Sequence, residues 1–307
     1  MCNEYDGGKC ESCGTYFSYI TLDGVLLRST YWHEISVREA LSECNLRGKY
    51  CGKAALRGTM SPMSQRIRLL GIPIDTLTGE EACARMIGFL AGGAQHHVLT
   101  PNSEMLVASV RDTDFRRVLQ EGDLNIPDSA GLLLMARFTG QKIPERVTGV
   151  DTVRQFCSQL SSEHSVFLLG AGEGVAERAA DALRAANAQL VVAGTFAGSP
   201  SPEDEDEICE RIRTSGASVL FVAYGAPAQD MWIARTLKNL PSVSIAMGVG
   251  GTFDFLAGKQ KRAPKFFQRC GLEWLWRLMR EPRRIGRIVT AVIVFPLCVL
   301  RYGKNAP

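Results

Sequence analysis

The chain has 307 residues, of which 46% are hydrophobic and 22% are charged. This is the composition of a globular protein, which excludes a wholly disordered chain and leaves room for one large α/β domain with appendages. The net charge of +3 conceals an asymmetry, because residues 259–307 carry a net charge of +10 and residues 1–258 carry −7. We expect the basic segment to meet phosphates or an anionic lipid surface. A solvated basic helix is the alternative interpretation.

Residues 1–64 show no clear periodicity, and we predict a poorly ordered leader. Five of the ten cysteines lie there, and Cys10 and Cys13 have the spacing of a zinc knuckle. A zinc site is therefore the alternative to a poorly ordered leader. No apolar core of a signal peptide precedes the domain, so the expected compartment is the reducing cytosol.

Short β-branched runs alternate with amphipathic stretches of helical length over residues 65–258. The runs that we predict as strands are 97–99, 124–127, 166–169, 190–192, 219–222 and 243–246. This alternation predicts an α/β fold with a Rossmann-like parallel sheet and helices on both of its faces.

Helix starts are marked by capping residues. Thr78 and Glu81 form a capping box, and Ser201 and Pro202 precede a run of acids. Two sequences, Asp112-Thr-Asp114 and Asp204-Glu-Asp206, match the D-x-D pattern with which many glycosyltransferases hold a metal. Because both stand at helix starts, we interpret them as helix signals and predict no metal site.

Small polar residues follow two of the predicted strands, at the edge where parallel α/β sheets place their ligands. Asp128 follows 124–127, where its carboxylate is a candidate general base for an attacking hydroxyl. The N-cap of a helix that begins at Ser129 is the alternative role. Thr100 and Asn102 follow 97–99, where they either orient a sugar or cap the next helix.

Glycine-rich turns follow three further strands. Gly170 and Gly172 open a helix, so their backbone N–H groups either face a phosphate or form a plain tight turn. The remaining candidates are Tyr224, Gly225 and Gln229 after 219–222, and Asp254 after 243–246. Gln229 and Asp254 offer an amide and a carboxylate to sugar hydroxyls. We expect these strand ends to converge on one cleft.

Basic and aromatic residues intermix after Gly258. Arg277, Arg284 and Arg287 share one helix face by their three-four spacing, beside two tryptophans. Such a face suits the boundary between phosphates and lipid headgroups. The longest apolar run, 288–300, has thirteen residues and contains Pro296, so we expect it to lie in the interface or on the protein.

Ordered sequence blocks make residues 65–290 resemble the WecG/TagA/CpsF glycosyltransferases. The matching blocks are Thr100-Pro-Asn102, Ile126-Pro-Asp128, Arg146 with Gly149 and Asp151, Gly225-Ala-Pro227-Ala-Gln229, Gly250-Gly-Thr-Phe-Asp254, Lys261-Arg262-Ala-Pro264, and Glu273-Trp274 leading to Glu281-Pro-Arg283. One departure is Asp230, which follows Gln229 where the family has glutamate.

The resemblance implies an inverting transferase that needs neither metal nor cofactor. Its substrates would be a UDP-sugar donor, with N-acetylmannosamine favoured, and an undecaprenyl-diphosphate-linked sugar acceptor in cell-surface polysaccharide synthesis. The resemblance assigns the general base to Asp128, and it places Thr100, Asn102 and Gln229 around the sugar with Asp254 lining the pocket. It also divides the chain into a catalytic domain, 65–258, and a membrane-docking appendage, 259–307.

Without a metal, arginines and backbone N–H groups must stabilise the charge that grows on the diphosphate. The remaining substrate-binding candidates are Arg146, Asp151, Arg262, Arg277, Arg284 and Arg287. These assignments imply a cytoplasmic protein, peripheral on the inner face of the cytoplasmic membrane. We expect no nucleic-acid partner, and a mobile tail is typical of a homo-oligomer. UDP-glucose or a UDP-hexuronate as donor, and a non-catalytic nucleotide- or lipid-binding module, are the alternatives.

Overall fold

The computed structural model describes residues 65–260, 263–264, 267, 273–280 and 282–306. Of residues 1–64 it describes only two backbone segments, β1 (Tyr19–Leu22) and β2 (Val25–Arg28), which pair antiparallel. The predicted zinc pair, Cys10 and Cys13, lies outside the described residues. Met1–Met63 and Ser64–Pro307 form two separate compact units, and the second contains every candidate site residue.

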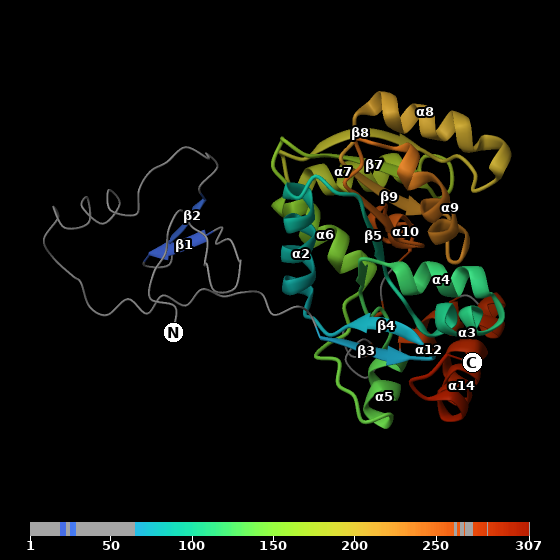
Figure 1. Ribbon diagram of the computed structural model, residues 1–307. Helices are drawn as coiled ribbons and strands as arrows, with labels where there is room; N and C mark the ends of the chain where they lie inside the picture. The colour runs from blue at the N-terminus through green and yellow to red at the C-terminus, as the bar shows by residue number, and fades with distance from the viewer. Residues whose placement is uncertain are drawn as a thin grey trace, which may run out of the picture. The chain divides into compact units, whose positions relative to one another are not determined.

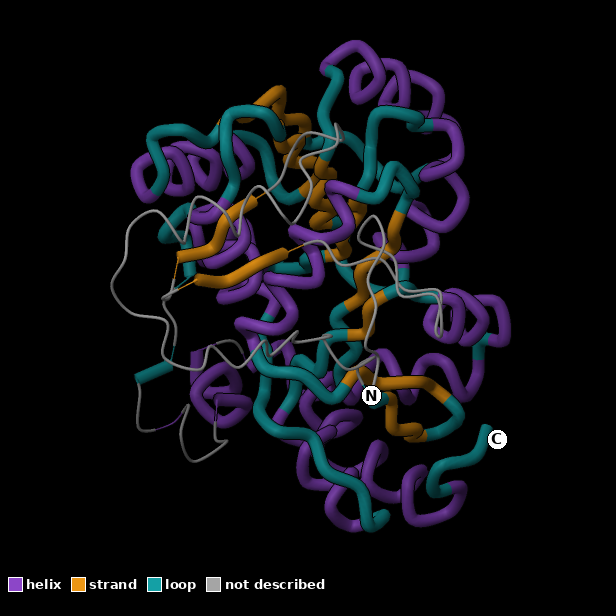
Figure 2. The backbone as a smooth tube through the Cα atoms, turned by 60° about the vertical axis from the view of Figure 1, so that its left-hand side comes forward, coloured by secondary structure: helices purple, strands orange, loops and turns teal. Residues whose placement is uncertain are grey.

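A six-stranded parallel sheet forms the centre of the second unit, as the sequence predicts (Figure 2). The strand order is β6-β5-β10-β9-β7-β8. The strands are β5 (His96–Leu99), β6 (Leu124–Asn125), β7 (Ser165–Gly170), β8 (Val191–Phe196), β9 (Val219–Ala223) and β10 (Ile245–Gly248). Because all run the same way, the turns that follow them lie at one edge.

Helices cover both faces of this sheet, and the pleat of the strands explains why. Val166 and Leu168 of β7 point into one apolar core, whereas Phe167 and Leu169 point into another. The first core also takes side chains from α2 (Gly79–Ala91), α6 (Gly149–Gln159), α7 (Val175–Ala186) and α10 (Thr252–Leu256). The second takes them from α8 (Glu205–Ser215) and α9 (Ala228–Thr236).

A third core lies below the sheet in the view of Figure 1, and we call the elements around it the lower lobe. Its first element is the antiparallel hairpin of β3 (Arg66–Leu69) and β4 (Ile72–Asp75). The others are α3 (Ser103–Arg111), α4 (Thr113–Glu121), α5 (Ala130–Phe138) and α14 (Phe295–Tyr302). The lobe therefore joins the two ends of the described unit.

The C-terminal segment is helical in its described residues between Glu273 and Tyr302. It consists of α12 (Glu273–Arg280), a 3-10 turn (Pro282–Arg284), α13 (Ile285–Val289), a π-helical turn (Thr290–Val294) and α14. Phe295 and Val299 are fully buried in the lower-lobe core. Beyond α14, the carbonyl groups of Gly303 and Lys304 accept from the N–H groups of Leu70 and Gly71, at 3.1 and 3.0 Å. The end of the basic segment is thus part of this core, and a separate function for 259–307 stays a prediction.

The helical stretch Pro282–Tyr302 contains an 18-residue window with a mean hydropathy of 1.8 and, by length and composition alone, is long enough to cross a bilayer. The count of apolar residues over 288–300 did not predict this length, because the helix extends beyond both ends of that run, from Pro282 to Tyr302. Phe295 and Val299 nevertheless hold it against the lower lobe. These contacts agree with the expectation that the run packs on the protein.

The predicted helix signals are confirmed. Thr78 and Glu81 form the capping box of α2, and the Asp112 carboxylate accepts from the Phe115 N–H at the start of α4. Pro202 opens the 3-10 turn that leads into α8. Both D-x-D sequences therefore lie at helix starts, as interpreted.

Candidate functional site

Three residues from three different segments, two loops and the start of α10, meet around Gly149, the first residue of α6. The Gly149 N–H donates a hydrogen bond of 3.2 Å to Oδ2 of Asp128. A Cβ atom built on Gly149 would lie 3.5 Å from Oγ1 of Thr252, 3.7 Å from Cγ2 of Thr100 and 3.8 Å from Oδ2 of Asp128. The sheet thus brings Asp128 and Thr100 together, as the sequence predicts, with two residues that it did not single out.

Asp128 is half-buried and does not cap the helix that follows it. That role belongs to Ser129, whose hydroxyl accepts from the Leu132 N–H at 3.2 Å. Asp128 lies instead at the N-terminus of α6, where the positive end of the helix dipole favours a negative charge. Its carboxylate therefore lies at the sheet edge that the sequence predicts, and its role as a base stays a prediction.

Thr100 and Asn102 hold the local backbone. The Thr100 hydroxyl donates to the carbonyl of Gly248 at 3.1 Å and so joins the turns after β5 and β10. The side-chain oxygen of Asn102 accepts from the N–H groups of Glu104 and Met105, both at 3.0 Å, and caps α3. Of the two roles considered from the sequence, Asn102 therefore takes that of the cap.

Gln229 is 2% exposed and clamps two glycine turns. Its Oε1 atom accepts from the N–H groups of Gly225 and Gly250, at 3.1 and 2.8 Å. These glycines have φ angles of +81° and +52°, in the left-handed region that glycine adopts at least cost. The side-chain carbonyl of Gln229 thus faces backbone and orders the turns, and its contact with a sugar stays a prediction.

A buried pair of titratable residues, Asp230 and His97, lies next to Gln229. Asp230 has no exposed surface, and its Oδ1 lies 4.0 Å from Nε2 of His97 on β5. Neither carboxylate oxygen of Asp230, nor His97 Nε2, has a hydrogen-bond partner of regular geometry. Burial raises the pKa of Asp230 from 3.8 to about 7, although the Gln229 amide opposes the rise. Burial lowers the pKa of His97 from 6.5 to about 4, and the charge of Asp123 opposes that fall.

These two shifts affect stability in opposite directions. A raised Asp pKa means that the folded chain binds the proton more tightly, so the contribution of Asp230 falls as pH rises from about 4 to 7. His97 binds its proton less tightly in the folded chain, so its contribution rises with pH from about 4 to 6.5. Over the shared range the two contributions offset one another.

Asp230→Asn is therefore expected to make the free energy of unfolding rise more steeply with pH between 4 and 6.5 than in the wild type. His97→Asn is expected to tilt the same curve the other way, because only the contribution of Asp230 remains. Urea denaturation over this pH range measures both slopes. Parallel curves for the two variants and the wild type would show that neither group titrates as its burial requires.

The glycine turn after β7 lies beside α10 and the residues that follow it. Gly170 has a φ of +101°, and a Cβ there would lie 2.8 Å from the backbone of Ala223, so packing against β9 requires this glycine. Gly172 is exposed, and its Cβ would lie 3.8 Å from Nζ of Lys259. Lys259 also pairs with Asp254, at 3.4 Å from Nζ to Oδ1. The ion pair of Lys259 and Asp254 thus lies beside the exposed glycine turn at Gly172.

Tyr224 points away from these groups. Its buried hydroxyl lies where a Cβ on Gly198 would come within 2.7 Å, and its ring packs edge-on against Trp232. Burial, with a smaller effect of the Asp204 charge, raises the pKa of this phenol. Tyr224 is therefore half-buried against the core under α8 and α9.

The predicted arginines are only partly described. Arg262 and the side chain of Arg277 lie outside the described residues. Arg146 and Arg284 are half-buried, and Asp151 is exposed, with its carboxylate accepting from the Thr148 hydroxyl at the start of α6. Arg287 donates to Glu104 of α3 at 2.6 Å.

A groove of about 540 Å³ runs between α3, the turn before α9 and the C-terminal helices. Three arginines, Arg111, Arg283 and Arg287, line it together with Asn102 and Pro227. Its wall also contains the apolar side chains of Met105, Val107, Phe115 and Val294. The groove thus combines cations with apolar surface at the edge of the sheet that carries Asn102.

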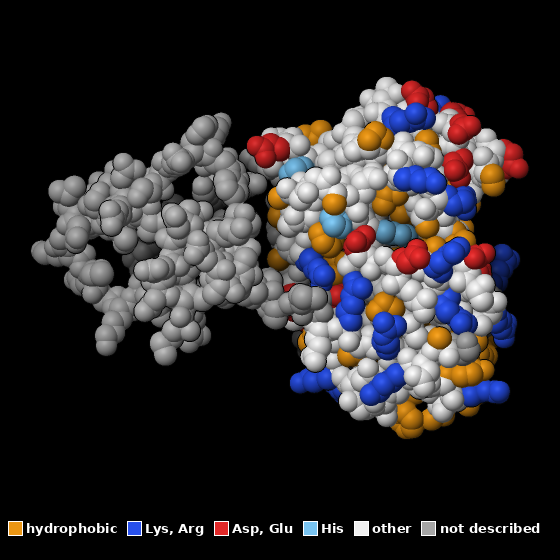
Figure 3. Space-filling view, viewed as in Figure 1, with side chains coloured by type: hydrophobic (Ala, Val, Ile, Leu, Met, Phe, Trp, Pro, Cys, Tyr) orange, Lys and Arg blue, Asp and Glu red, His pale blue; other side chains and the backbone are white. Residues whose placement is uncertain are grey.

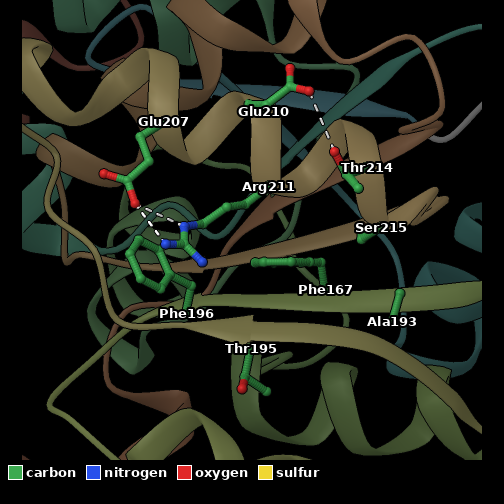
Figure 4. Close-up of a pocket in the computed structure, with 9 residues that line it drawn as sticks. All are labelled: Phe167, Ala193, Thr195, Phe196, Glu207, Glu210, Arg211, Thr214 and Ser215. Atoms are coloured by element: carbon green, nitrogen blue, oxygen red, sulfur yellow. Dashed lines mark hydrogen bonds and ion pairs between the residues drawn. The ribbon is translucent and has the colours of Figure 1, made fainter.

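A second groove, of about 580 Å³, lies between β8 and α8 (Figure 4). Arg211 lies over the ring of Phe196, 4.4 Å from its centroid, and pairs with Glu207. None of the predicted site residues lines this groove. No cluster of metal-binding side chains occurs among the described residues.

Sequence reasoning missed three residues of the site. Gly149 and Thr252 stand inside two of the matching blocks, but only the fold shows that they meet at Asp128. Lys259 follows Gly258, at the start of the basic segment, where its charge alone did not distinguish it from its neighbours. Its position beside Asp254 and Gly172 depends on the short helix α10.

Comparison with known proteins gives consistent matches. The sequence profile described as "Glycosyl transferase WecG/TagA/CpsF family" matches residues 67–307. An N-acetylglucosaminyldiphosphoundecaprenol N-acetyl-beta-D-mannosaminyltransferase of Bacillus subtilis (strain 168) is 28% identical over 209 residues, 68% of this chain and 80% of the relative. A protein of the same name from Bacillus spizizenii is 29% identical over 203 residues, 64% of this chain and 78% of the relative.

Proposed function

This chain belongs to the WecG/TagA/CpsF glycosyltransferase family, and we propose that it moves N-acetylmannosamine, or a related hexose or N-acetylhexosamine, from UDP to an undecaprenyl-diphosphate-linked sugar. The names of both relatives state such a transfer onto N-acetylglucosaminyldiphosphoundecaprenol. The observation that carries the proposal is the carboxylate of Asp128 at the N-terminus of α6, beside Thr100 at the same sheet edge. The reaction would serve cell-surface polysaccharide synthesis.

In the proposed reaction, the acceptor hydroxyl attacks the anomeric carbon from the face opposite UDP. Asp128 takes the hydroxyl proton while the bond from the anomeric carbon to the UDP oxygen breaks, so the configuration inverts. The hydrogen bond from the Gly149 N–H fixes one oxygen of the carboxylate and thereby its orientation. Gln229 acts at a distance, by keeping the two glycine turns in register.

The leaving UDP carries the growing negative charge, and the protein must stabilise it with cations and N–H groups. Two groups support this role. Lys259 stands at the exposed turn of Gly172, next to the N-terminus of α7. The second group consists of three arginines that line the groove beside α3, namely Arg111, Arg283 and Arg287.

The donor is tested by incubating the protein with a short-chain prenyl-diphosphate sugar and a panel of UDP-sugars. Transfer from UDP-N-acetylmannosamine in preference to UDP-glucose or a UDP-hexuronate is the expected result. Transfer from one of the other donors would change the assigned sugar and leave the reaction class unchanged.

A non-catalytic nucleotide- or lipid-binding module is the alternative from another class. Such a module does not require a carboxylate to be brought to Thr100 by separate strands, so the geometry around Gly149 favours the enzyme. Absence of transfer with every UDP-sugar, together with retained UDP binding in calorimetry, would support the module instead.

The lipid-linked acceptor also suggests where the protein works. We propose a cytoplasmic protein held at the inner face of the membrane by its basic C-terminal segment. Its net charge of +10 over 259–307 supports attraction to anionic lipid.

A further inference from the structure

Helix α5 of the lower lobe presents two large apolar side chains to solvent. Leu134 and Phe138 are each 65% exposed, and their spacing of four residues puts them on one face. The opposite face of the helix is buried through Leu132, Met135 and Ala136. The exposed pair is thus fixed in place by a well-anchored helix.

The C-terminal helices carry a second row of exposed apolar residues. Its members follow one another at helical spacings and are Ile285, Val289, Ile293, Leu297 and Leu300. Only 11% of the most apolar window of this stretch is buried. Phe295 and Val299 point the other way, into the lower-lobe core, so this row is also held by the fold.

The two helices pack against each other. A Cβ on Gly131 of α5 would lie 3.7 Å from the ring of Phe295 of α14. Exposed cations flank them, namely Arg137 in the last turn of α5, Lys142 after it, Arg301 in the last turn of α14 and Lys304 after it. Figure 3 shows orange side chains at the lower end of this unit, with blue ones above and beside them.

We propose that α5 and the C-terminal helices form one docking surface for an anionic lipid bilayer, with Leu134 and Phe138 inserted in the interface. Apolar side chains surrounded by Arg and Lys match the acyl boundary and the phosphates of such a bilayer. The surface adds the catalytic domain itself to the expected basic segment. The reason for docking rests on the proposed function, whereas the evidence for the surface is the exposure of its apolar side chains and the charge of the Arg and Lys residues beside them.

This surface also relates the membrane to the candidate base. Asp128 lies two residues before α5, which begins at Ala130. Docking through α5 would therefore bring the loop that carries the carboxylate close to the headgroup layer. A sugar linked to a lipid through a diphosphate lies at that level, so this surface places the proposed base near its acceptor.

Flotation with lipid vesicles tests the surface without any turnover. The double variant Leu134→Gln and Phe138→Gln is compared with the wild type on vesicles of phosphatidylcholine mixed with phosphatidylglycerol. We expect the double variant to bind the vesicles at least about tenfold more weakly than the wild type, because two inserted side chains are lost. Val191→Gln is the matched control. Val191 is also exposed, but it lies on β8 of the six-stranded sheet, outside the lower lobe.

A second double variant, Leu297→Gln and Leu300→Gln, separates the two helices. Loss of binding in both double variants supports one shared surface, whereas wild-type binding by the α5 variant alone overturns the role of α5. A change from oligomer to monomer in the α5 variant without vesicles would assign the surface to a second copy of the chain, and would also overturn the proposal. Transfer to a water-soluble, short-chain acceptor should stay unchanged in the α5 variant. Failure of the wild type in that assay would reject the proposed function and leave the flotation result intact.

Discussion

Asp128→Asn is expected to lower the turnover number about a hundredfold or more while the KM values for both substrates change little. The amide keeps the shape of the side chain, and its oxygen still accepts from the Gly149 N–H, so the site stays ordered. It has lost the capacity to take the proton of the attacking hydroxyl. The rate of UDP release with a prenyl-diphosphate sugar as acceptor measures the effect.

Asp112→Asn provides the matched control for this variant. Asp112 is also a carboxylate that accepts a backbone N–H at a helix start, but it stands on the linker between α3 and α4. Asparagine is an equally good cap there, and we expect unchanged turnover. Normal turnover of Asp128→Asn would move the base to another residue and remove the central support of the proposed mechanism.

Phe295→Ala is expected to lower the free energy of unfolding by about 3 to 5 kcal/mol, because the ring is fully buried and its loss leaves a cavity. The affected core is that of the lower lobe, which holds the hairpin of β3 and β4 as well as α5. Denaturation with guanidinium chloride, followed by circular dichroism, measures the loss.

Leu297→Ala lies two residues away on the same helix and is the control. Its side chain is 59% exposed, so we expect a change within about 0.5 kcal/mol. Equal, small losses of unfolding free energy in both variants would mean that α14 is a detachable appendage. The predicted domain boundary after residue 258 implies such an appendage. A large loss only for Phe295→Ala would show that stability depends on the end of the basic segment.

The sequence predicts the sheet well because its signals are local. Most strands are short runs that contain β-branched residues, and the turns that follow carry glycine or a capping residue, so the edge that bears Asp128 and Thr100 follows from the parallel topology. The helix starts are equally local, as Thr78 and Asp112 show.

Contacts between distant segments were not predictable in this way. Nothing near Gln229 in the sequence indicates that its carbonyl would be taken by Gly225 and Gly250, which depends on the neighbouring positions of β9 and β10. Tyr224 looked equivalent to Gly225 by position, but its ring is large and apolar enough to be drawn into the core beside Trp232. The sequence likewise left open whether α14 lies in the membrane interface or packs on the protein, since its exposed residues outnumber the two that anchor it.

The hairpin of β3 and β4 has a consequence for the order in which the chain folds. Its residues are synthesised early, yet the groups that cover it, from Phe295 to Lys304, follow more than two hundred residues later. At ribosomal rates of about 5 to 20 residues per second, the hairpin waits tens of seconds for them. The lower lobe therefore closes last, after the sheet that it completes, and its early apolar residues are the ones that a chaperone would have to shield.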